Sequence, residues 1–303
     1  MRTNARSLSR VFAVCVLSIA GGWGGSAAGL ASEQVTEQSG ATRVADRGAP
    51  ARVAATSDGY LELNMCGSDC PGTTAQKVSE IATEVLAARP QAIALNEVCG
   101  RQLTALRTEL SNRGYPMTES FVRTKTARGS CSGDSFGEAV FVRGPVLDVD
   151  RVTFDAQQSP QGEQRAMICV LTETTVKERV CSTHLVPGAI PADVRAQQVR
   201  QVARVMSAYR YRTVLMGDFN TTPTNNGLDP LYSARHGGGA TGRFTEVYAN
   251  ATGGACRCGA ATRDSGKIDY IFVTDGGLDP VSRSVKNLQW SDHHLVRGTV
   301  TVR

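Results

Sequence analysis

The apolar positions of this chain recur mostly with the two-residue period of a β-strand, and in three segments with the period of a helix. Alternation or a short apolar run predicts strands over residues 60–65, 92–95, 137–143, 166–173, 178–185, 213–217, 267–273 and 293–302. Helical spacing covers 76–89, the stretch with Leu103, Leu106 and Leu110, and 192–208. Strands outnumber helices, and hairpins mix with crossovers. The pattern therefore predicts one α/β domain, a sandwich of mostly antiparallel sheets with helices outside.

The first 58 residues lack this pattern. Residues 1–31 begin with three arginines and no acid, continue with the apolar stretch VFAVCVLSIA and end in small residues, which is typical of a secretion signal peptide. That stretch is too short to span a bilayer. Residues 32–58 mix charged residues with Gly, Ala and Pro and are expected to form a flexible linker. We therefore expect a folded domain over 59–303 in a secreted protein, without stable membrane insertion.

The formal net charge is too small to identify a partner. It is +5 for the whole chain and falls to +2 without residues 1–31, which hold three arginines and no acid. An overall field that captures polyanions is not expected, so any affinity for nucleic acid or phosphate must come from a local arrangement. Nothing in the sequence indicates an obligate protein partner.

Eight of the nine cysteines follow residue 31, and an even number in an exported chain favours disulfides over zinc. Cys169 and Cys181 lie symmetrically in a predicted hairpin and would face each other. The simplest completion, among other pairings that stay open, joins sequence neighbours: Cys66–Cys70, Cys99–Cys131 and Cys256–Cys258.

Several polar residues interrupt the strand pattern at strand ends. Some come at or just after the ends of predicted strands: Asn64, Glu97, His184, Asp218 and Asn220. Others come at the starts of predicted strands: Asp269, Asp292 and His293. Antiparallel neighbours bring such ends to one rim of a sheet. Each residue alone would be read as a turn former or a structural hydrogen-bonding group. Their convergence on one rim favours chemistry.

These side chains suit the hydrolysis of a phosphate ester. Oxygen ligands hold hard cations such as Mg²⁺, so Glu97 is a candidate ligand, with Asp292 or Asn64 completing the set. His184 and His293 titrate near neutrality, and Asp269 can fix the tautomer of one of them. The chain has no HExxH, GxSxG or Gly-Lys-Ser motif, which argues against zinc, a serine nucleophile and a phosphate-cradling loop.

The motifs LNMCG, ALNEV, STHL, GDFNTTP, IDYIFV and SDHH occur in this order over residues 63–294. As an ordered set they resemble the endonuclease/exonuclease/phosphatase family. The resemblance implies a four-layer α/β sandwich of two packed mixed, mostly antiparallel β-sheets with helices on the outer faces. It also implies Mg²⁺ as cofactor, with Mn²⁺ or Ca²⁺ in some members.

The resemblance also implies roles. Glu97 would bind the metal with Asn64 beside it, and Asp292 would be a second ligand. Catalysis would use one set of residues to orient water and phosphate and to move protons: Asp218, Asn220, Asp269, His184 and His293.

The stretches FGEAVFV and QRAMICV are similar to the pancreatic-type deoxyribonucleases. By that likeness Glu138 supports His184, and Arg165 contacts phosphate together with Asn220. One departure is Asn96, where many members have Gln before the metal-binding glutamate.

The function expected from these residues is that of a secreted, metal-dependent phosphodiesterase. We expect a nuclease that hydrolyses DNA by in-line attack of water, with RNA as a further candidate substrate. Alternatives are a phospholipase C-like or sphingomyelinase-like enzyme, a phosphatase of sugar or inositol phosphates, and a non-catalytic binding module. With 6% aromatic residues, and Trp290 as the one tryptophan after residue 31, the sequence shows no aromatic hairpin for a lipid surface.

Overall fold

The structure, a computed structural model, describes residues 57–303 apart from 68, 126–130, 158–161, 175, 189, 251–255 and 265. The predicted signal peptide and the linker up to residue 56 lie outside the described residues. In the part that is described, no helix is both long and apolar enough to cross a bilayer.

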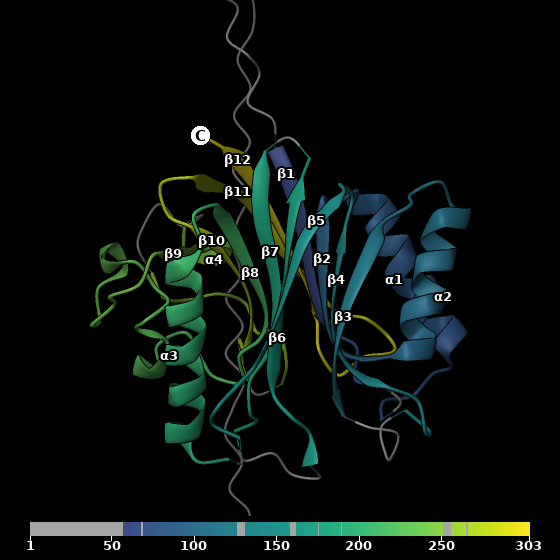
Figure 1. Ribbon diagram of the computed structural model, residues 1–303, viewed down its shortest axis with the longest axis horizontal. Coiled ribbons are helices and arrows are strands. Elements are labelled where there is room, and N and C mark those ends of the chain that lie inside the picture. Colours follow the sequence, from purple (N-terminus) through teal and green to yellow (C-terminus); the bar gives the residue numbers. More distant parts are fainter. Residues whose placement is uncertain are drawn as a thin grey trace, which may run out of the picture. The chain divides into compact units, whose positions relative to one another are not determined.

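Two six-stranded β-sheets pack face to face (Figure 1). The first has the order β11-β12-β1-β2-β4-β3, with β1 (Ser57–Asn64), β2 (Ala92–Cys99), β3 (Thr118–Lys125), β4 (Phe136–Val142), β11 (Leu278–Lys286) and β12 (Leu295–Val302). The second has the order β5-β6-β7-β8-β10-β9, with β5 (Val146–Thr153), β6 (Ala166–Glu173), β7 (Lys177–His184), β8 (Arg212–Asp218), β9 (Phe244–Glu246) and β10 (Asp269–Thr274). The pairs β1–β2 and β7–β8 are parallel, and the other pairs are antiparallel.

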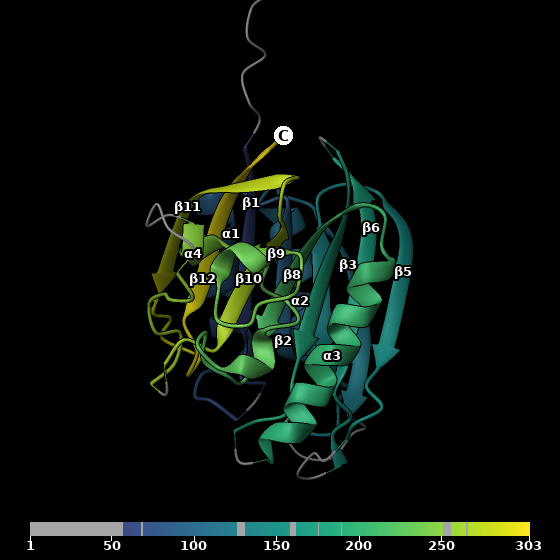
Figure 2. The same ribbon diagram turned by 90° about the vertical axis from the view of Figure 1, so that its left-hand side faces the viewer.

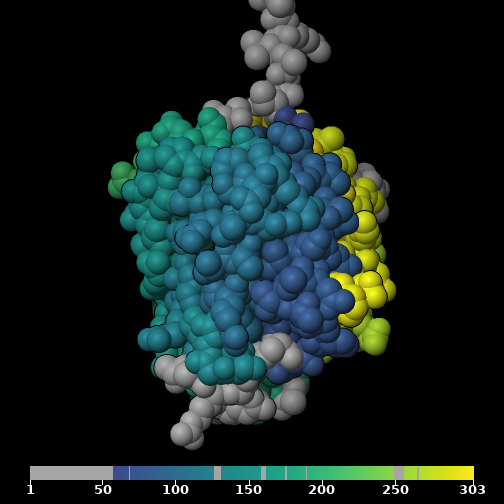
Figure 3. Space-filling model, turned by 90° about the vertical axis from the view of Figure 1, so that its right-hand side faces the viewer, coloured from purple at the N-terminus to yellow at the C-terminus, as the bar shows by residue number. Residues whose placement is uncertain are grey.

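Helices cover the outer faces of both sheets. Helices α1 (Thr74–Ala88) and α2 (Gly100–Asn112) lie on the first sheet, and α3 (Ala192–Ala208) lies on the second (Figures 1 and 2). Figure 3 shows the α1–α2 face, where residues of the first half of the chain form the surface and C-terminal residues follow its edge. A short helix, α4 (Val247–Asn250), follows β9, and the 3₁₀ turns Asn226–Leu228 and Ala234–His236 precede it. The predicted four-layer α/β sandwich is confirmed.

Strand β2 shows how the layers form. Ile93 and Leu95 face α1 and α2, whereas Ala92 and Ala94 face the second sheet, and all four are fully buried. A strand covered on both faces reads as a continuous apolar run, which is why AIAL does not alternate. A third core lies between the second sheet and α3, where Val199 and Val202 pack on Leu215.

The sequence pattern did not indicate four strands: β3, β5, β9 and β11. All four lie at sheet edges. Strands β3, β5 and β11 are also only partly covered, so their apolar alternation is weak, and β9 is only three residues long. Strand β11 also contains Pro280, and its pairing with β12 shifts register between Pro280 and Ser282. Proline cannot donate to a ladder and is confined to such positions. Strand β1 starts at Ser57, two residues before the expected domain boundary.

Four disulfides join the predicted partners: Cys66–Cys70, Cys99–Cys131, Cys169–Cys181 and Cys256–Cys258. Cys169 and Cys181 are directly opposite in the β6–β7 hairpin. The Cys66–Cys70 bridge closes the loop that leaves β1, and Cys99–Cys131 fixes the end of β2, so both lie next to the rim that carries the polar residues.

A polar contact crosses the interface between the sheets far from that rim. The Tyr60 hydroxyl of β1 donates to Glu178 Oε2 of β7 at 2.7 Å, with both side chains buried. Burial raises the pKa of Glu178 to about 7, although the Tyr60 hydrogen bond opposes the shift. The ordinary value in an unfolded chain is about 4.3. The folded protein therefore holds a proton on Glu178 over a pH range in which the unfolded chain does not.

Replacing this acid should change how stability depends on pH. The contribution of the Glu178 proton is complete below about pH 4.3 and is lost as the pH rises through about 7, because the native state binds the extra proton. Relative to wild type, Glu178→Gln should gain up to about 3 kcal/mol between pH 5 and pH 8, measured by urea unfolding. Glu173→Gln, at the exposed end of β6, is the control. A parallel pH profile for Glu178→Gln and wild type would contradict a buried neutral Glu178.

Candidate active site

The ends of several strands bring polar side chains together at one rim. Asn64 is in register with Asn96 across β1–β2, and His184 is in register with Asp218 across β7–β8. Asp218 faces Asp269 across β8–β10. Because the ends of β1, β2, β7 and β8 meet the start of β10, residues from distant parts of the chain line one site.

Glu97 is aimed by a backbone irregularity. The β2–β4 pairing shifts register between Leu95 and Val98, and Glu97 has a φ of +53°, in the left-handed region. A bulge of this kind re-aims one side chain. The Glu97 side chain stays 25% exposed, whereas Asp218 and Asp269 are almost fully buried. Its Oε1 accepts a hydrogen bond of 3.2 Å from Asn64 Nδ2, which also lies 3.3 Å from Asp218 Oδ2.

Asn96 connects the two sheets behind the site. Its Nδ2 donates to Glu138 Oε2 on β4 at 2.7 Å and to Ser182 Oγ on β7 at 3.1 Å. Its Oδ1 accepts from the Asp218 backbone N–H on β8 at 2.8 Å. The amide is completely buried, so these bonds fix the positions of two acids. In the sequence, Asn96 stands out only as a departure from a family pattern.

His184 is buried among charged groups. A guanidinium can only donate, so the 2.6 Å contact with Arg165 Nη1 makes Nδ1 an acceptor and leaves the proton of the neutral ring on Nε2. Nε2 lies 3.5 Å from Asp218 Oδ2, 3.8 Å from Glu97 Oε1 and 3.2 Å from Asn220 Nδ2. Burial and the Arg165 charge lower the pKa of His184 well below its usual value. The ring is therefore neutral at neutral pH.

His293 has the opposite electrostatic setting. Its Nδ1 lies 3.0 Å from both Asp269 oxygens, which fix the ring. Burial alone would lower the pKa of His293, but the Asp269 hydrogen bond and charge raise it to about 9. Its Nε2 has no hydrogen-bond partner among the described residues and lies 3.7 Å from Asp218 Oδ2. The site thus holds one neutral and one protonated imidazole.

Asp218 lies between the two imidazoles. Its Oδ1 accepts from the Asn220 backbone N–H at 2.8 Å, and Asn220 takes a φ of +51°, which asparagine tolerates better than most residues. Burial and the nearby Asp269 charge raise the pKa of Asp218 to about 7. This value suits a group that takes a proton near neutral pH.

A further buried acid, Glu62, was not singled out from the sequence. It is fully buried, and neither carboxylate oxygen has a hydrogen-bond partner among the described residues. Burial, Asp269 and Asp218 raise the pKa of Glu62 well above its usual value. Strand parity could have found it, because Glu62 lies two residues before Asn64 and so shares its face.

Three predicted residues have neighbours that the sequence did not indicate. Arg165 is 4% exposed and pairs with Glu163 at 3.0 Å as well as with His184. Glu138 Oε1 lies 3.7 Å from His184 Nδ1, and burial raises the pKa of Glu138 to about 7. Asp292 pairs with Arg263 at the surface. The phosphate contact of Arg165 and the ligand role of Asp292 stay predictions.

The oxygen donors at this rim fit a hard divalent cation. Glu97 supplies a partly exposed carboxylate, and Asn64 and Asp218 lie beside it. Asp218, Asp269 and His293 also place ligand atoms within 4.8 Å of one another, but here Asp269 already holds the histidine Nδ1. Asp292 lies near the sulfurs of Cys66 and Cys70, which are bonded to each other and so cannot act as thiolates. Glu97 is therefore the best placed ligand.

Comparison with known proteins agrees with this fold. The model of the Endonuclease/Exonuclease/phosphatase family matches residues 61–293. No curated protein matches the chain in sequence. The chain belongs to the Endonuclease/Exonuclease/phosphatase family. Enzymes of this family hydrolyse phosphoric esters and typically use a divalent metal.

Three solved structures illustrate the likeness in fold. An endonuclease/exonuclease/phosphatase from Beutenbergia cavernae is 20% identical, with a TM-score of 0.62 over 81% of this chain and 72% of that one. D. rerio TDP2 complexed with single-strand DNA product is 15% identical, with a TM-score of 0.61 over 81% and 99%. A mannosyl-6-phosphatase from Bacteroides thetaiotaomicron is 15% identical, with a TM-score of 0.57 over 80% and 99%.

Removing the Asn96 amide should weaken both fold and site. Asn96→Ala leaves Glu138 and the Asp218 N–H without their partner in a buried place, so we expect a loss of about 2–4 kcal/mol in the free energy of unfolding. Urea unfolding measures it. Asn112→Ala, at the exposed end of α2, should change stability by less than about 0.5 kcal/mol. Equal stabilities of the two variants would show that the amide does not hold the sheets together.

Proposed function

We propose that this protein is a secreted, Mg²⁺-dependent nuclease that hydrolyses DNA by in-line attack of water on a phosphodiester. The observation that carries the proposal is the position of Asp218 between the neutral His184 at 3.5 Å and the protonated His293 at 3.7 Å. A proton acceptor and a proton donor then face the same small space. Both are needed when water attacks phosphorus and an alkoxide leaves.

In this reaction water forms a new bond to phosphorus while the ester P–O bond breaks. The Asp218 carboxylate takes a proton from water, and Asn220 helps to orient the phosphoryl group. The Nε2–H of His293, which has no hydrogen-bond partner among the described residues and lies 3.7 Å from Asp218 Oδ2, gives its proton to the leaving oxygen. Asp269 holds the His293 ring and favours its charged form. A divalent cation bound by Glu97 and its neighbours would neutralise charge on the phosphate.

His184 takes a supporting role in this scheme. Arg165 fixes its tautomer, so that Nε2–H lies on the side of Asp218, 3.5 Å from Oδ2, and can donate to a phosphoryl oxygen there. Glu138 balances the buried guanidinium charge nearby. A neutral donor in this position stabilises a phosphoryl oxygen without adding another proton to the site.

Several observations favour a polynucleotide over a lipid. The exposed large apolar side chains among the described residues are Leu147, Tyr211 and Val281, which lie on separate elements. An enzyme that works at a lipid surface needs a contiguous apolar patch. TDP2, similar in fold, is complexed with a DNA product in its structure. The mannosyl-6-phosphatase keeps a phosphatase of sugar phosphates as the second candidate.

Secretion is supported by two features. Residues 1–31 have the composition of a signal peptide. In addition, all eight cysteines after residue 31 form disulfides in the structure, and disulfides persist in oxidising compartments.

The two imidazoles provide a direct test. His293→Ala should lower kcat for plasmid DNA with Mg²⁺ by about 10²- to 10⁴-fold, the range typical of a lost acid–base group. His184→Ala should lower it by about 10²- to 10³-fold, the range typical of a lost donor to a developing oxyanion. His294→Ala is the matched control, because the hydrogen bond of that ring to a described residue runs to the Ala261 carbonyl near the surface. Substrates in parallel should be single-stranded DNA, RNA, sphingomyelin and inositol phosphates, each with a chelator control. Full DNA cleavage by both variants would refute the proposal.

Glu97 is tested by titrating the metal. Glu97→Gln should raise the Mg²⁺ concentration for half-maximal activity by at least about tenfold, a loss seen even for residues that only orient a ligand. Glu119→Gln, a surface carboxylate paired with Arg107, should leave the titration curve in place. A wild-type curve for Glu97→Gln would remove Glu97 as the ligand, whichever substrate is cleaved.

A further inference from the structure

A pocket of about 530 Å³ opens beside the candidate active site. Its walls come from the loop after β7, from α3, from the loop after β8 and from the loop before β10, and Asn220 belongs to its lining. The same Asn220 lies 3.2 Å from His184 Nε2, so the pocket adjoins the reacting groups. Its size suits a ligand of the bulk of one nucleotide unit.

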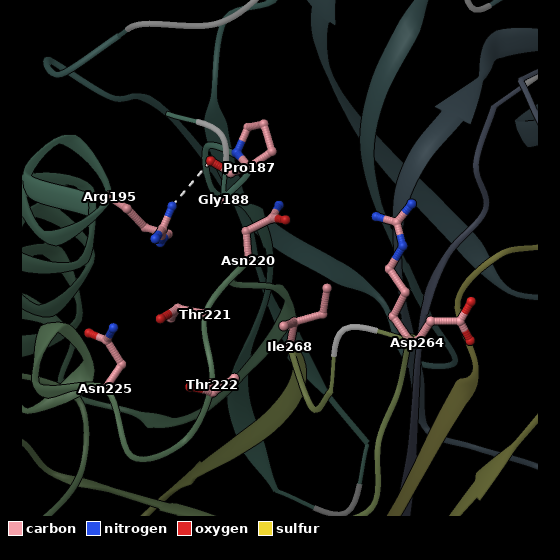
Figure 4. A pocket seen from close by; sticks show the side chains of 10 residues that line it. Pro187, Gly188, Arg195, Asn220, Thr221, Thr222, Asn225, Asp264 and Ile268 are labelled. Atoms are coloured by element: carbon pink, nitrogen blue, oxygen red, sulfur yellow. Dashed lines mark hydrogen bonds between the residues drawn. The ribbon is translucent and has the colours of Figure 1, made fainter. Parts of the chain in front are cut away.

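Arg195 of α3 is the cation of this pocket. It is only 9% exposed, and its Nη1 donates to the carbonyls of Val186 and Pro187. Figure 4 shows it reaching from α3 toward the side of the pocket that holds Asn220. The other guanidinium nitrogens have no hydrogen-bond partner among the described residues. These nitrogens are not among the fully buried atoms that lack a partner, so they face the pocket.

Arg195 also lacks a carboxylate partner. Other largely buried arginines have one: Arg165 pairs with Glu163, Arg179 with Asp148 and Arg257 with Asp229. No described carboxylate lies within ion-pair distance of Arg195, although Asp218 acts on it from further away. A buried charge is costly unless it is paired. An anion entering from the pocket would supply the missing charge.

The other charged residues of the pocket wall do not fill this role. Arg263 is already paired with Asp292. Asp264 belongs to the loop before β10, and its side chain is exposed to solvent. In Figure 4, Asp264 lies on the opposite side of the pocket from Arg195. The half of the pocket next to Arg195 is therefore polar and cationic.

We propose that this pocket binds a second phosphate of the substrate, next to the phosphate that is hydrolysed, and that Arg195 is the residue that binds it. The inference rests on the proposed nuclease function and narrows its substrate to a chain with at least two phosphates. A choline phospholipid and a sugar monophosphate each have a single phosphate, the one that is hydrolysed, so both would leave Arg195 unpaired. The pocket thus favours polynucleotides over both alternatives.

The test compares substrates with one and two phosphates. TpT contains a single phosphodiester, whereas pTpT and TpTp add a phosphate on one side or the other. Wild-type enzyme should cleave one of the two longer substrates with a kcat/KM about 10- to 100-fold above that for TpT, as expected for a charge-assisted contact. Arg195→Met, which keeps the apolar stem, should remove most of that preference. It should also reduce the slope of log kcat/KM for single-stranded DNA against log salt concentration by about one phosphate contact.

Controls separate binding from folding. Arg200→Met changes an exposed arginine of the same helix and should keep both the preference and the salt slope. If Arg195→Met unfolds, Arg195→Lys retains the charge and should show an intermediate preference. Inositol polyphosphates tested alongside reveal whether any second phosphate is accepted or only one in a nucleotide chain.

The outcomes are distinct. Equal losses on TpT and on the two-phosphate substrates for Arg195→Met would show a merely structural role and overturn the inference, while the nuclease function would stand. Faster cleavage of inositol polyphosphates than of oligonucleotides would overturn the nucleotide chain as the source of the second phosphate. A wild-type enzyme that cleaves none of the nucleotides would refute the nuclease function and this inference together.

Discussion

The site depends on one buried amide that joins the two sheets. Asn96 of β2 bonds Glu138 of β4 within its own sheet, and bonds Ser182 of β7 and the Asp218 backbone of β8 across the interface. Packed apolar faces fix the distance between two sheets but allow sliding, because apolar contact has no direction. Directional bonds at the rim set the register in which His184, Asp218 and Glu97 meet. The chemistry therefore rests on a residue that touches no substrate in the proposed reaction.

A second constraint is the concentration of negative charge. Six acids surround the two imidazoles: Glu62, Glu97, Glu138, Glu163, Asp218 and Asp269. Ionising all six acids in a buried site is unfavourable, because burial and mutual repulsion disfavour the charged forms. The structure reduces the negative charge in three ways. Glu62 and Glu138 have raised pKa values, His293 carries a proton, and Arg165 supplies a fixed positive charge. A divalent cation at Glu97 would add the charge that an incoming phosphate requires.

The same electrostatics divides the rim into two regions. Near Glu97 the acids favour a cation, whereas across Asn220 the unpaired Arg195 favours an anion. A phosphodiester placed between them would have its reacting phosphate near the metal ligand and its neighbour near the arginine. This division depends on which arginines have a carboxylate close enough to form an ion pair. The small net charge of the chain does not produce it.

Much of the fold and several site positions could be predicted from the sequence by itself. The spacing of apolar residues, and the turn residues between apolar segments, predicted the central strands and the three long helices. Side chains buried on one face of an element must recur at the period of that element. Polar residues after strands marked the rim. The hairpin position of Cys169 and Cys181 indicated one bridge, and the other three were the simplest of several possible pairings. The edge strands β3, β5 and β11 were not predicted from the sequence, because a partly covered strand needs little apolar alternation.

Only the tertiary structure decided which partners those polar residues meet. Arg165 proved to face His184, Asn96 proved to span the sheets, and Arg195, one of several arginines on an amphipathic helix, proved to be buried without an acid. Such contacts join residues far apart in the chain, and their strength depends on burial and on neighbouring charges, neither of which is encoded in local spacing.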